Sequence, residues 1–380
     1  MSEVTQHPSV QAVLEQPIPQ RMEFFRNRVI GHRILVQVRD EILAAIRLDA
    51  ELSLIFLHGP TGAGKTTVVK KSRNDVRKLF ELDAAKDPSF IPDIYVKVWP
   101  PEVGPFSFRD LYLSFLDVLE EPHLENRVPT LAVEESAKSV RSRGKSATEL
   151  RRMVVSSFKR HRLRVLFLDE AQHMESVASG KSFLAQLNTL KTLADETGVV
   201  IVLSGTQDLL QMLELNGQLA RRSMECLFGR YLPHDEADRQ EFANIVASFA
   251  SHVPMPEAPD LLKHLALAYE GSLGLVGCFK PWLNRAVARA LDRARILAEQ
   301  DLTATMLTSG ARLRIAQEIQ NYEIQASQEG ANRAEIRKLL GLRSAPVPAE
   351  PKAPPGPAAT RPRAVGERNP TRDPVGPERP

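Results

Sequence analysis

The sequence predicts an α/β fold in which a parallel five-stranded sheet is flanked by helices and followed by a small helical region and a disordered tail. Apolar runs of strand length alternate along the chain with stretches of helical periodicity, as the crossover connections of a parallel sheet require. A glycine-rich loop joins the first of these strands to a helix, and a later strand ends in two adjacent carboxylates. These three observations together predict the fold class.

The first predicted strand, residues 51–58, runs directly into a complete G-x-x-x-x-G-K-[ST] loop, and we expect a helix from Thr66 to about Leu79. The glycines let the backbone fold its N–H groups around a phosphate chain at a helix N-terminus, where the helix dipole favours negative charge. A plain glycine turn would need neither the Lys-Thr pair nor this spacing. The pattern therefore predicts a nucleoside triphosphate site that comprises Gly59, Pro60, Thr61, Gly62, Ala63, Gly64, Lys65, Thr66 and Thr67.

Two adjacent carboxylates, Asp169 and Glu170, end the predicted strand that begins at Arg164. In P-loop enzymes an acidic residue at such a strand end holds Mg²⁺, so we expect Asp169 and the Thr66 hydroxyl to ligate the metal while Lys65 reaches the β- and γ-phosphates. Glu170 is then the natural base to orient and deprotonate the attacking water. Taken alone, such a pair often only begins a helix. Its combination with an intact phosphate loop favours ATP hydrolysis.

A third site residue is expected where another strand ends. The segment 198–204 reads as a strand and is followed by a glycine and then Thr206. Thr206 is the expected contact to the γ-phosphate or the attacking water, and Ser204 is the alternative. The remaining predicted strands are residues 93–99 and 226–232.

Two adjacent arginines, Arg221 and Arg222, lie in a stretch that we expect to be helical, residues 216–225. An arginine at this point of the fold would face a neighbouring subunit's nucleotide and act as a finger that stabilises transition-state charge. The alternative is a solvated or salt-bridged helix face. The sequence does not distinguish between the two arginines.

Residues 235–238 spell the D-E-A-D box of helicases, but they open a polar segment of helical composition that continues to Ser251. Acidic residues in a first helical turn complement the helix dipole. Because a better acidic strand end exists at Asp169, we interpret these four residues as a helix start.

A basic stretch, residues 138–164, holds ten lysines and arginines and only one acidic residue, Glu149. Its first part is a loop of small and basic residues that enters a helix at Ala147, an arrangement that suits contacts with phosphate oxygens. The alternative is a solvated charged face. No recognition helix or zinc finger is visible, so we expect sequence-independent contacts with double-stranded DNA from Arg141, Arg143, Lys145 and Ser146.

The composition is that of a soluble intracellular protein. The 380 residues carry a formal net charge of +3, and no apolar run approaches the roughly 18 residues that a membrane span needs. The N-terminus has no signal-peptide core. Cys226 and Cys278 cannot make a disulfide framework and lack metal-ligand spacing. We therefore expect a cytoplasmic protein that does not associate with membranes.

Taken together, these residues resemble an AAA+ ATPase and, within that superfamily, the transposition helper ATPases of the TniB/TnsC type, which are related to the phage Mu B protein. The resemblance covers roughly residues 20–300. It implies ATP- and Mg²⁺-dependent self-association into rings or helical filaments on double-stranded DNA, with a transposase and a target-selector protein as partners. The motifs that carry it are Leu57-His-Gly-Pro-Thr-Gly-Ala-Gly-Lys-Thr-Thr67, Trp99-Pro-Pro-Glu-Val-Gly104, Leu166-Phe-Leu-Asp-Glu-Ala-Gln-His173, Leu203-Ser-Gly-Thr206, Gln218-Leu-Ala-Arg-Arg222 and an upstream His32, expected near the nucleotide, before an apolar helix.

Composition and this resemblance together divide the chain into five segments. Many AAA+ proteins carry a sensor arginine near the position of Gly274, so here either Lys280 replaces it or the lid senses nucleotide without a cation. The tail holds eleven of the 27 prolines and no aromatic residue, a composition that cannot bury a core. The segments are an N-terminal extension (1–50, with a helix at about 34–46), a nucleotide-binding domain (51–232), a helical lid (233–300), a helical appendage that faces a partner (301–343) and the disordered tail (344–380).

Three other functions stay open. One is a helicase or clamp loader, although helicase motifs beyond the nucleotide site are absent. Another is a nucleotide-gated signalling or secretion-assembly ATPase with no role on DNA. The last is a scaffold that binds ATP and hardly hydrolyses it, against which the presence of Glu170 argues.

Overall fold

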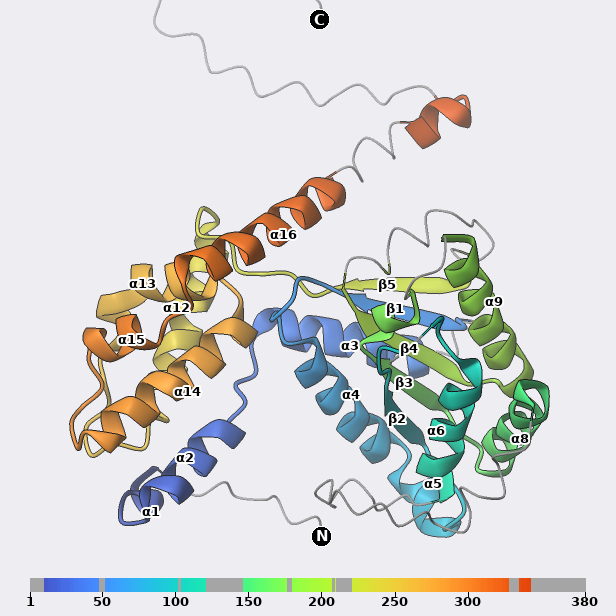
Figure 1. Ribbon diagram of the computed structural model, residues 1–380, viewed down its shortest axis with the longest axis horizontal. Helices are drawn as coiled ribbons and strands as arrows, with labels where there is room; N and C mark the ends of the chain where they lie inside the picture. Colours follow the sequence, from blue (N-terminus) through green and yellow to red (C-terminus); the bar gives the residue numbers. More distant parts are fainter. Residues whose placement is uncertain are drawn as a thin grey trace, which may run out of the picture. The chain divides into compact units, whose positions relative to one another are not determined.

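The computed structural model describes residues 10–47, 52–101, 104–120, 146–175, 180–206, 209, 221–327 and 335–342. The chain divides into two compact units, Met1–Ile324 and Gln325–Pro380. The first unit holds the sheet and the helices that surround it (Figure 1). Within the described ranges no helix is both long and apolar enough to cross a membrane. The predicted proline-rich tail lies outside the described residues.

Five parallel strands form one sheet in the order β2-β3-β4-β1-β5, which confirms the predicted architecture. β1 is paired on both sides, because Leu54 lies opposite Ile201 of β4 and opposite Ser223 of β5. Every residue of β1 and β3 is buried, as expected for parallel strands that are covered on both faces. The strands are β1 (Leu54–His58), β2 (Asp93–Lys97), β3 (Val165–Asp169), β4 (Val200–Gly205) and β5 (Ser223–Leu227).

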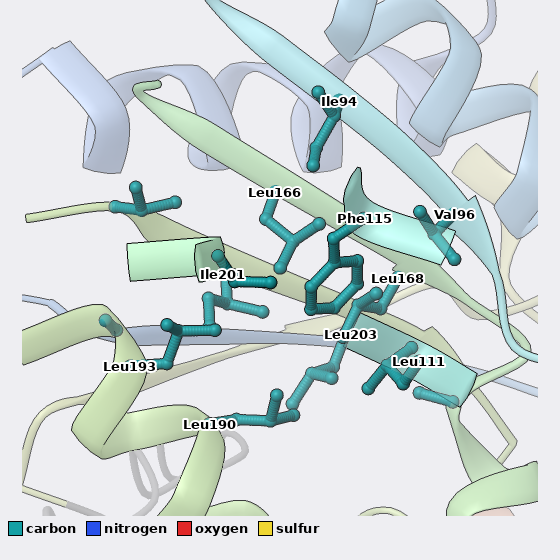
Figure 2. Close-up of a cluster of buried hydrophobic side chains, with 14 of the residues drawn as sticks. Ile94, Val96, Leu111, Phe115, Leu166, Leu168, Leu190, Leu193, Ile201 and Leu203 are labelled. Atoms are coloured by element: carbon teal, nitrogen blue, oxygen red, sulfur yellow. The ribbon is translucent and has the colours of Figure 1, made fainter. Parts of the chain in front are cut away.

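Helices cover both faces of this sheet (Figure 1). One face packs against α3 and α4, whose apolar stripes share a core with β1. The other face packs against α6, α8 and α9, and Figure 2 shows Phe115 of α6 and Leu190 of α9 around Leu166 of β3 and Ile201 of β4. The helices of this part are α3 (Arg33–Arg47), α4 (Lys65–Leu79), α5 (Glu81–Lys86), α6 (Phe108–Glu120), α8 (Ala147–Arg160), the short 3-10 helix η2 (Ala171–Glu175) and α9 (Gly180–Thr197).

Strand β5 begins and ends earlier than the sequence predicts. It spans Ser223–Leu227, whereas the sequence predicts a strand over 226–232 and a helix over 216–225. The helix prediction is therefore wrong for residues 221–225, the first two of which form a turn, while residues 216–220 lie outside the described residues. The physical reason is strand pairing: Leu227 lies opposite His58, the last residue of β1, and beyond that point β1 no longer offers a partner.

A second core is formed by helices outside the sheet region. Its first helix, α12, has Asp235 as its N-cap, which accepts a hydrogen bond from the backbone N–H of Asp238, so these acidic residues do begin a helix. Trp282 of α14 and Phe25 of the N-terminal helix α2 are buried in the same core. The helices outside the sheet region are α1 (Val10–Leu14), α2 (Ile18–Asn27), α12 (Glu236–Ala250), η3 (Leu261–His264), α13 (Leu265–Ser272), α14 (Val276–Asp292) and α15 (Glu299–Thr305).

The last long helix that the structure describes, α16 (Ser309–Ser327), contributes side chains to the core beside the sheet. Ile319 is 2 % exposed and lies in the core that also contains residues of β1, α3 and α4. Tyr322, one turn further along α16, is also buried. The sequence predicts a helical appendage that faces a partner, and its pattern does not indicate this packing.

Candidate nucleotide-binding site

The phosphate loop joins β1 to α4 by a turn that only glycines allow. Gly62 and Gly64 adopt φ angles of 78° and 118°, in the left-handed region that favours glycine. A Cβ atom on Gly59 would lie 2.2 Å from the carbonyl oxygen of Phe228, so this position has no room for a side chain. Gly64 is the N-cap of α4. The turn thus places the loop at a helix N-terminus, whose unpaired N–H groups attract anions.

The Lys65 ammonium group is held inside the loop. Its Nζ donates to the carbonyl oxygens of Gly59 and Pro60, at 2.7 and 3.0 Å. Burial lowers the pKa of Lys65, and the nearby carboxylates of Glu170 and Glu318 oppose that shift. A partly desolvated cation beside a bed of N–H groups is suited to bind phosphate oxygens.

Thr66 and Asp169 meet at the carboxyl end of β3, as the sequence predicts for a metal site. Thr66 Oγ1 donates to Asp169 Oδ2 at 2.9 Å, and the Tyr95 hydroxyl donates to the same oxygen at 3.1 Å. Within the described ranges no group of three or more acidic, histidine or cysteine side chains could hold a metal alone. A hydroxyl and one carboxylate fit Mg²⁺, which is usually held by one or two carboxylates together with substrate phosphates.

Glu170, the predicted base, is linked to the neighbouring strand by Gln172. Glu170 has a φ of 57°, a strained value for a residue with a side chain. Gln172 Nε2 donates to Glu170 Oε2 at 2.6 Å, and Gln172 Oε1 accepts from the backbone N–H of Thr206 at 3.3 Å. Gln172 is not among the predicted site residues, although its place two residues after the predicted base is a signal for this role.

The two alternatives at the end of β4 both lie beside the phosphate loop. Ser204 is opposite Leu57, and Gly205 is opposite His58, the residue that immediately precedes the loop. Ser204 is fully buried, and its Oγ has no hydrogen-bond partner among the described residues. Thr206 is half-buried just beyond the strand. Both side chains therefore remain candidates for contacts near the γ-phosphate.

Behind the loop lies a cavity of about 70 Å³, much smaller than the roughly 300 Å³ or more of typical small-molecule sites. His32, which is expected from the sequence to lie near a nucleotide, lines this cavity. It is 5 % exposed. The Nδ1 atom of His32 lies 2.9 Å from the Tyr231 hydroxyl, and burial lowers the pKa of His32 to about 4. His32 is therefore neutral at pH 7. Other lining residues are Val29, Ile30, Ala63, Gly64, Thr67 and Lys280.

Helix α14 touches the phosphate loop directly. A Cβ atom on Gly277 would lie 2.3 Å from the Gly62 carbonyl oxygen and 2.8 Å from the Gly64 nitrogen. On the other side of this contact, a Cβ on Gly62 would lie 2.5 Å from Cys278 Sγ. At these two glycines, α14 and the loop are therefore packed too closely for any side chain.

Lys280, the candidate replacement for the sensor arginine of the lid, points into the helical core. Its Nζ donates to the Phe25 carbonyl oxygen at 2.5 Å and lies 3.3 Å from the centroid of the Phe25 ring. Burial lowers the pKa of Lys280 to about 7. The amine lines the cavity behind the loop, while the backbone of α14 contacts the loop itself.

Arg221 and Arg222 lie at the opposite end of the sheet from the phosphate loop. They precede Ser223, which is opposite the first residue of β1, whereas the loop follows the last one. Arg222 Nη1 donates to Asp195 Oδ1 at 3.2 Å, and both arginines are exposed. Neither arginine belongs to the nucleotide site of its own chain, a placement compatible with a finger that serves a neighbouring subunit.

Of the four residues predicted to contact DNA, Arg141, Arg143 and Lys145 lie outside the described residues. Ser146 is the N-cap of α8 and forms a capping box with Glu149. Its Oγ accepts from the Glu149 backbone N–H at 3.3 Å, and its own N–H donates to Glu149 Oε2 at 2.8 Å. Ser146 therefore fixes where α8 begins, directly after the basic loop.

Comparison with known families identifies the sheet region. Residues 50–213 match the family described as AAA domain. Together with the strand order, the match confirms the predicted P-loop AAA+ fold. No curated protein sequence matches the chain.

Solved structures resemble the chain only distantly. The Aeropyrum pernix ORC1 protein in complex with DNA is 20 % identical, with a TM-score of 0.48, over 78 % of this chain and 68 % of that one. The ORC2 protein of the same organism, in ADPNP–ADP complexes, is 16 % identical, with a TM-score of 0.46, over 73 % and 69 %. A Walker-type ATPase of Pyrococcus abyssi is 16 % identical, with a TM-score of 0.46, over 82 % and 85 %. These similarities concern the fold alone.

Proposed function

We propose that this protein is a Mg²⁺-dependent ATPase that assembles on double-stranded DNA and acts as a transposition helper. The observation that carries the ATPase part is the contact between Thr66 of the phosphate loop and Asp169 at the end of β3. That contact brings the loop, a metal-binding pair and the adjacent Glu170 to one end of the sheet. These are the groups that phosphoryl transfer needs, because its catalysis consists mainly of positioning and charge stabilisation.

Each residue of this site has a separate task in the proposal. The loop N–H groups and Lys65 bind the phosphates, while Thr66 and Asp169 hold Mg²⁺, which when bound neutralises phosphate charge. Glu170 accepts a proton from the attacking water, a contribution that is typically 10²- to 10⁴-fold. Gln172 is a positioning residue, because it fixes the Glu170 carboxylate relative to Thr206.

The DNA part of the proposal rests on charge. The stretch 138–164 contains ten basic residues and a single acidic residue, Glu149. The Glu149 carboxylate already takes part in the capping box of α8. Basic side chains in a loop before a helix N-terminus supply affinity for phosphate oxygens without sequence preference. We therefore assign backbone contacts with duplex DNA to this loop.

Assembly and partners follow from the resemblance to transposition helper ATPases. Rings or helical filaments would bring the exposed end of the sheet, with Arg221 and Arg222, towards a neighbouring subunit's phosphate loop. One of these arginines would then stabilise transition-state charge there. The assembly on cytoplasmic DNA would select the target site and recruit a transposase, with a target-selector protein as a further partner.

The test of this function is the ATPase rate with and without duplex DNA, together with DNA affinity over a range of salt concentrations. We expect duplex DNA to stimulate turnover. The variant Arg143→Ala/Lys145→Ala should bind every duplex sequence more weakly, with a salt slope smaller by about two, since each lost phosphate contact removes about one unit. Its ATP affinity should stay that of the wild type.

A matched control removes the same charge from the other end of α8. Lys159→Ala/Arg160→Ala, in the last turn of that helix, should keep the wild-type DNA affinity and salt slope. Equal losses in the two double variants would mean that net charge alone governs binding. An ATPase rate that duplex DNA does not change would instead indicate a nucleotide-gated regulator with no role on DNA.

A further inference from the structure

The phosphate loop has an anionic partner in its own chain, supplied by α16. Glu318 Oε1 accepts hydrogen bonds from the backbone N–H of Thr61 at 3.0 Å and from the Thr61 hydroxyl at 2.8 Å. Thr61 is the third residue of the loop, and Glu318 follows it by 257 positions. A carboxylate thus accepts hydrogen bonds from a residue of the loop that the sequence predicts to bind phosphates.

Two further contacts hold α16 against the same region. The Tyr322 hydroxyl is hydrogen-bonded to Nδ1 of His58, the last residue of β1 before the loop. Glu323 accepts two hydrogen bonds from Arg230, from Nε at 2.6 Å and from Nη2 at 2.9 Å. Parallel bonds from one guanidinium to one carboxylate are among the stronger polar contacts in proteins.

Apolar packing completes the attachment of this helix. Ile319 and Tyr322 are 2 % and 5 % exposed, and Ile315 packs against the same core. The spacing of these residues, together with Glu318 and Glu323, places them on one face of the helix. The face of α16 that holds Glu318 is therefore fixed by several contacts around the loop.

The charge of Glu318 acts on the group that would bind phosphate. Glu318 is one of the carboxylates that oppose the lowering of the Lys65 pKa by burial, so its negative charge lies close enough to stabilise the Lys65 cation. A triphosphate in the loop would bring several negative charges to the same cation. Like charges this close repel each other, most strongly where burial reduces solvent screening.

We propose that Glu318 and α16 form an acidic latch that a nucleotide must displace from the phosphate loop. This inference rests on the proposed function, because it assumes that the loop binds a nucleoside triphosphate. In the free protein the Glu318 carboxylate satisfies Thr61 and offsets the charge of Lys65. A bound triphosphate takes over both tasks, repels Glu318 and loosens α16.

The test compares the ATP affinity of the wild type with that of Glu318→Gln, by titration calorimetry. The amide keeps the size of the side chain and an oxygen that can accept from Thr61, so α16 should stay folded, as a thermal unfolding midpoint can check. We expect ATP to bind about tenfold more tightly, the change that corresponds to roughly 1.4 kcal/mol of lost like-charge repulsion.

The matched control is Glu323→Gln, which weakens the ion pair with Arg230 on the same helix but leaves Glu318 in place. It should change ATP affinity by less than about threefold, because Glu318 keeps its charge and the buried side chains of Ile319 and Tyr322 still hold α16 in place. An equal gain in both variants would assign the effect to anchoring of α16 and overturn the role of the Glu318 charge. Unchanged affinity in Glu318→Gln would overturn the latch.

Movement of the helix is measured separately by hydrogen exchange. In a Glu170→Gln background, where ATP should not be consumed, amides of residues 312–324 should exchange faster with ATP than without it. Unchanged or slower exchange would contradict displacement of α16. If neither the wild type nor Glu318→Gln bound ATP, the proposed function and the latch would both fail, whereas equal binding by the two would remove the latch only.

Discussion

The phosphate loop has carboxylates on two sides, and the two sides differ in origin. On the inner side, Asp169 is the last residue of β3 and Glu170 follows it, and Asp169 accepts from Thr66 at 2.9 Å. On the outer side, Glu318 of α16 accepts from Thr61 at 3.0 and 2.8 Å. The inner carboxylates lie at the end of β3, which neighbours β4 in the sheet, whereas the outer one comes from α16, far along the chain.

This difference shows that one residue type can serve opposite purposes around one loop. The inner carboxylates are placed where Mg²⁺ would offset their charge when nucleotide is bound. In the proposed latch, the outer carboxylate shares the Lys65 cation with the nucleotide, so the two compete. Inner substitutions should therefore impair turnover, whereas outer substitutions should strengthen nucleotide binding.

The largest expected effect concerns the residue that both sides share. Lys65→Ala should weaken ATP binding at least about a hundredfold, or about 2.7 kcal/mol, because it removes the loop's only side-chain cation and its charge-assisted hydrogen bonds. Titration with ATP measures this. Lys70→Ala, on the exposed surface of the same helix, should bind normally, and an unchanged affinity in Lys65→Ala would refute the site.

A second prediction concerns His58, which is hydrogen-bonded to Tyr322 of α16 on the outer side. His58 is 4 % exposed, and burial, with a smaller effect of Lys65, lowers its pKa to about 4. An unfolded chain binds that proton near pH 6.5, so folding stability falls as pH decreases from 6.5 towards 4. Between pH 7 and pH 5, His58→Gln should lose about 2 kcal/mol less stability than the wild type. Urea unfolding at both pH values measures this, and equal losses would contradict a buried neutral His58.

A smaller effect is expected on the inner side from Gln172→Ala. Without this side chain, the Glu170 carboxylate loses its link to the Thr206 backbone, and kcat should fall about tenfold, within the range of misplaced general bases. The KM for ATP should hardly change, because Gln172 touches no residue of the phosphate loop among the described contacts. Gln172→Glu would restore size but not the donor, so a normal kcat in that variant would argue against a positioning role.

Sequence reasoning predicts the inner side well and the outer side not at all. The inner side is built from short motifs, a strand with its loop and a strand with its acidic end, and a parallel sheet brings both to one edge. The outer contact joins Thr61 to Glu318 across 257 positions, and no local pattern specifies which surface α16 covers. The apolar stripe of Ile315, Ile319 and Tyr322 indicates only that this helix packs against something.

The fifth strand was misplaced for a similar reason. Its limits are set by pairing with β1, which ends at His58 opposite Leu227, and not by the apolar residues that continue to Leu232. Gln172 was missed because its role depends on contact with the end of β4, 34 positions away. In each case, the sequence does not show which strand or residue makes the contact.

The most direct test of the contrast between the two sides is the same substitution, Glu to Gln, at both. Glu170→Gln should bind ATP with wild-type affinity and lower kcat at least about a hundredfold, because an amide cannot accept the proton of the attacking water. Glu318→Gln should bind ATP more tightly and keep kcat at saturating ATP and Mg²⁺ within about threefold of the wild type, as expected for a group that competes with nucleotide and takes no part in the reaction. A turnover defect in Glu318→Gln as large as that in Glu170→Gln, or normal turnover in Glu170→Gln, would contradict the division of roles between the inner and outer carboxylates.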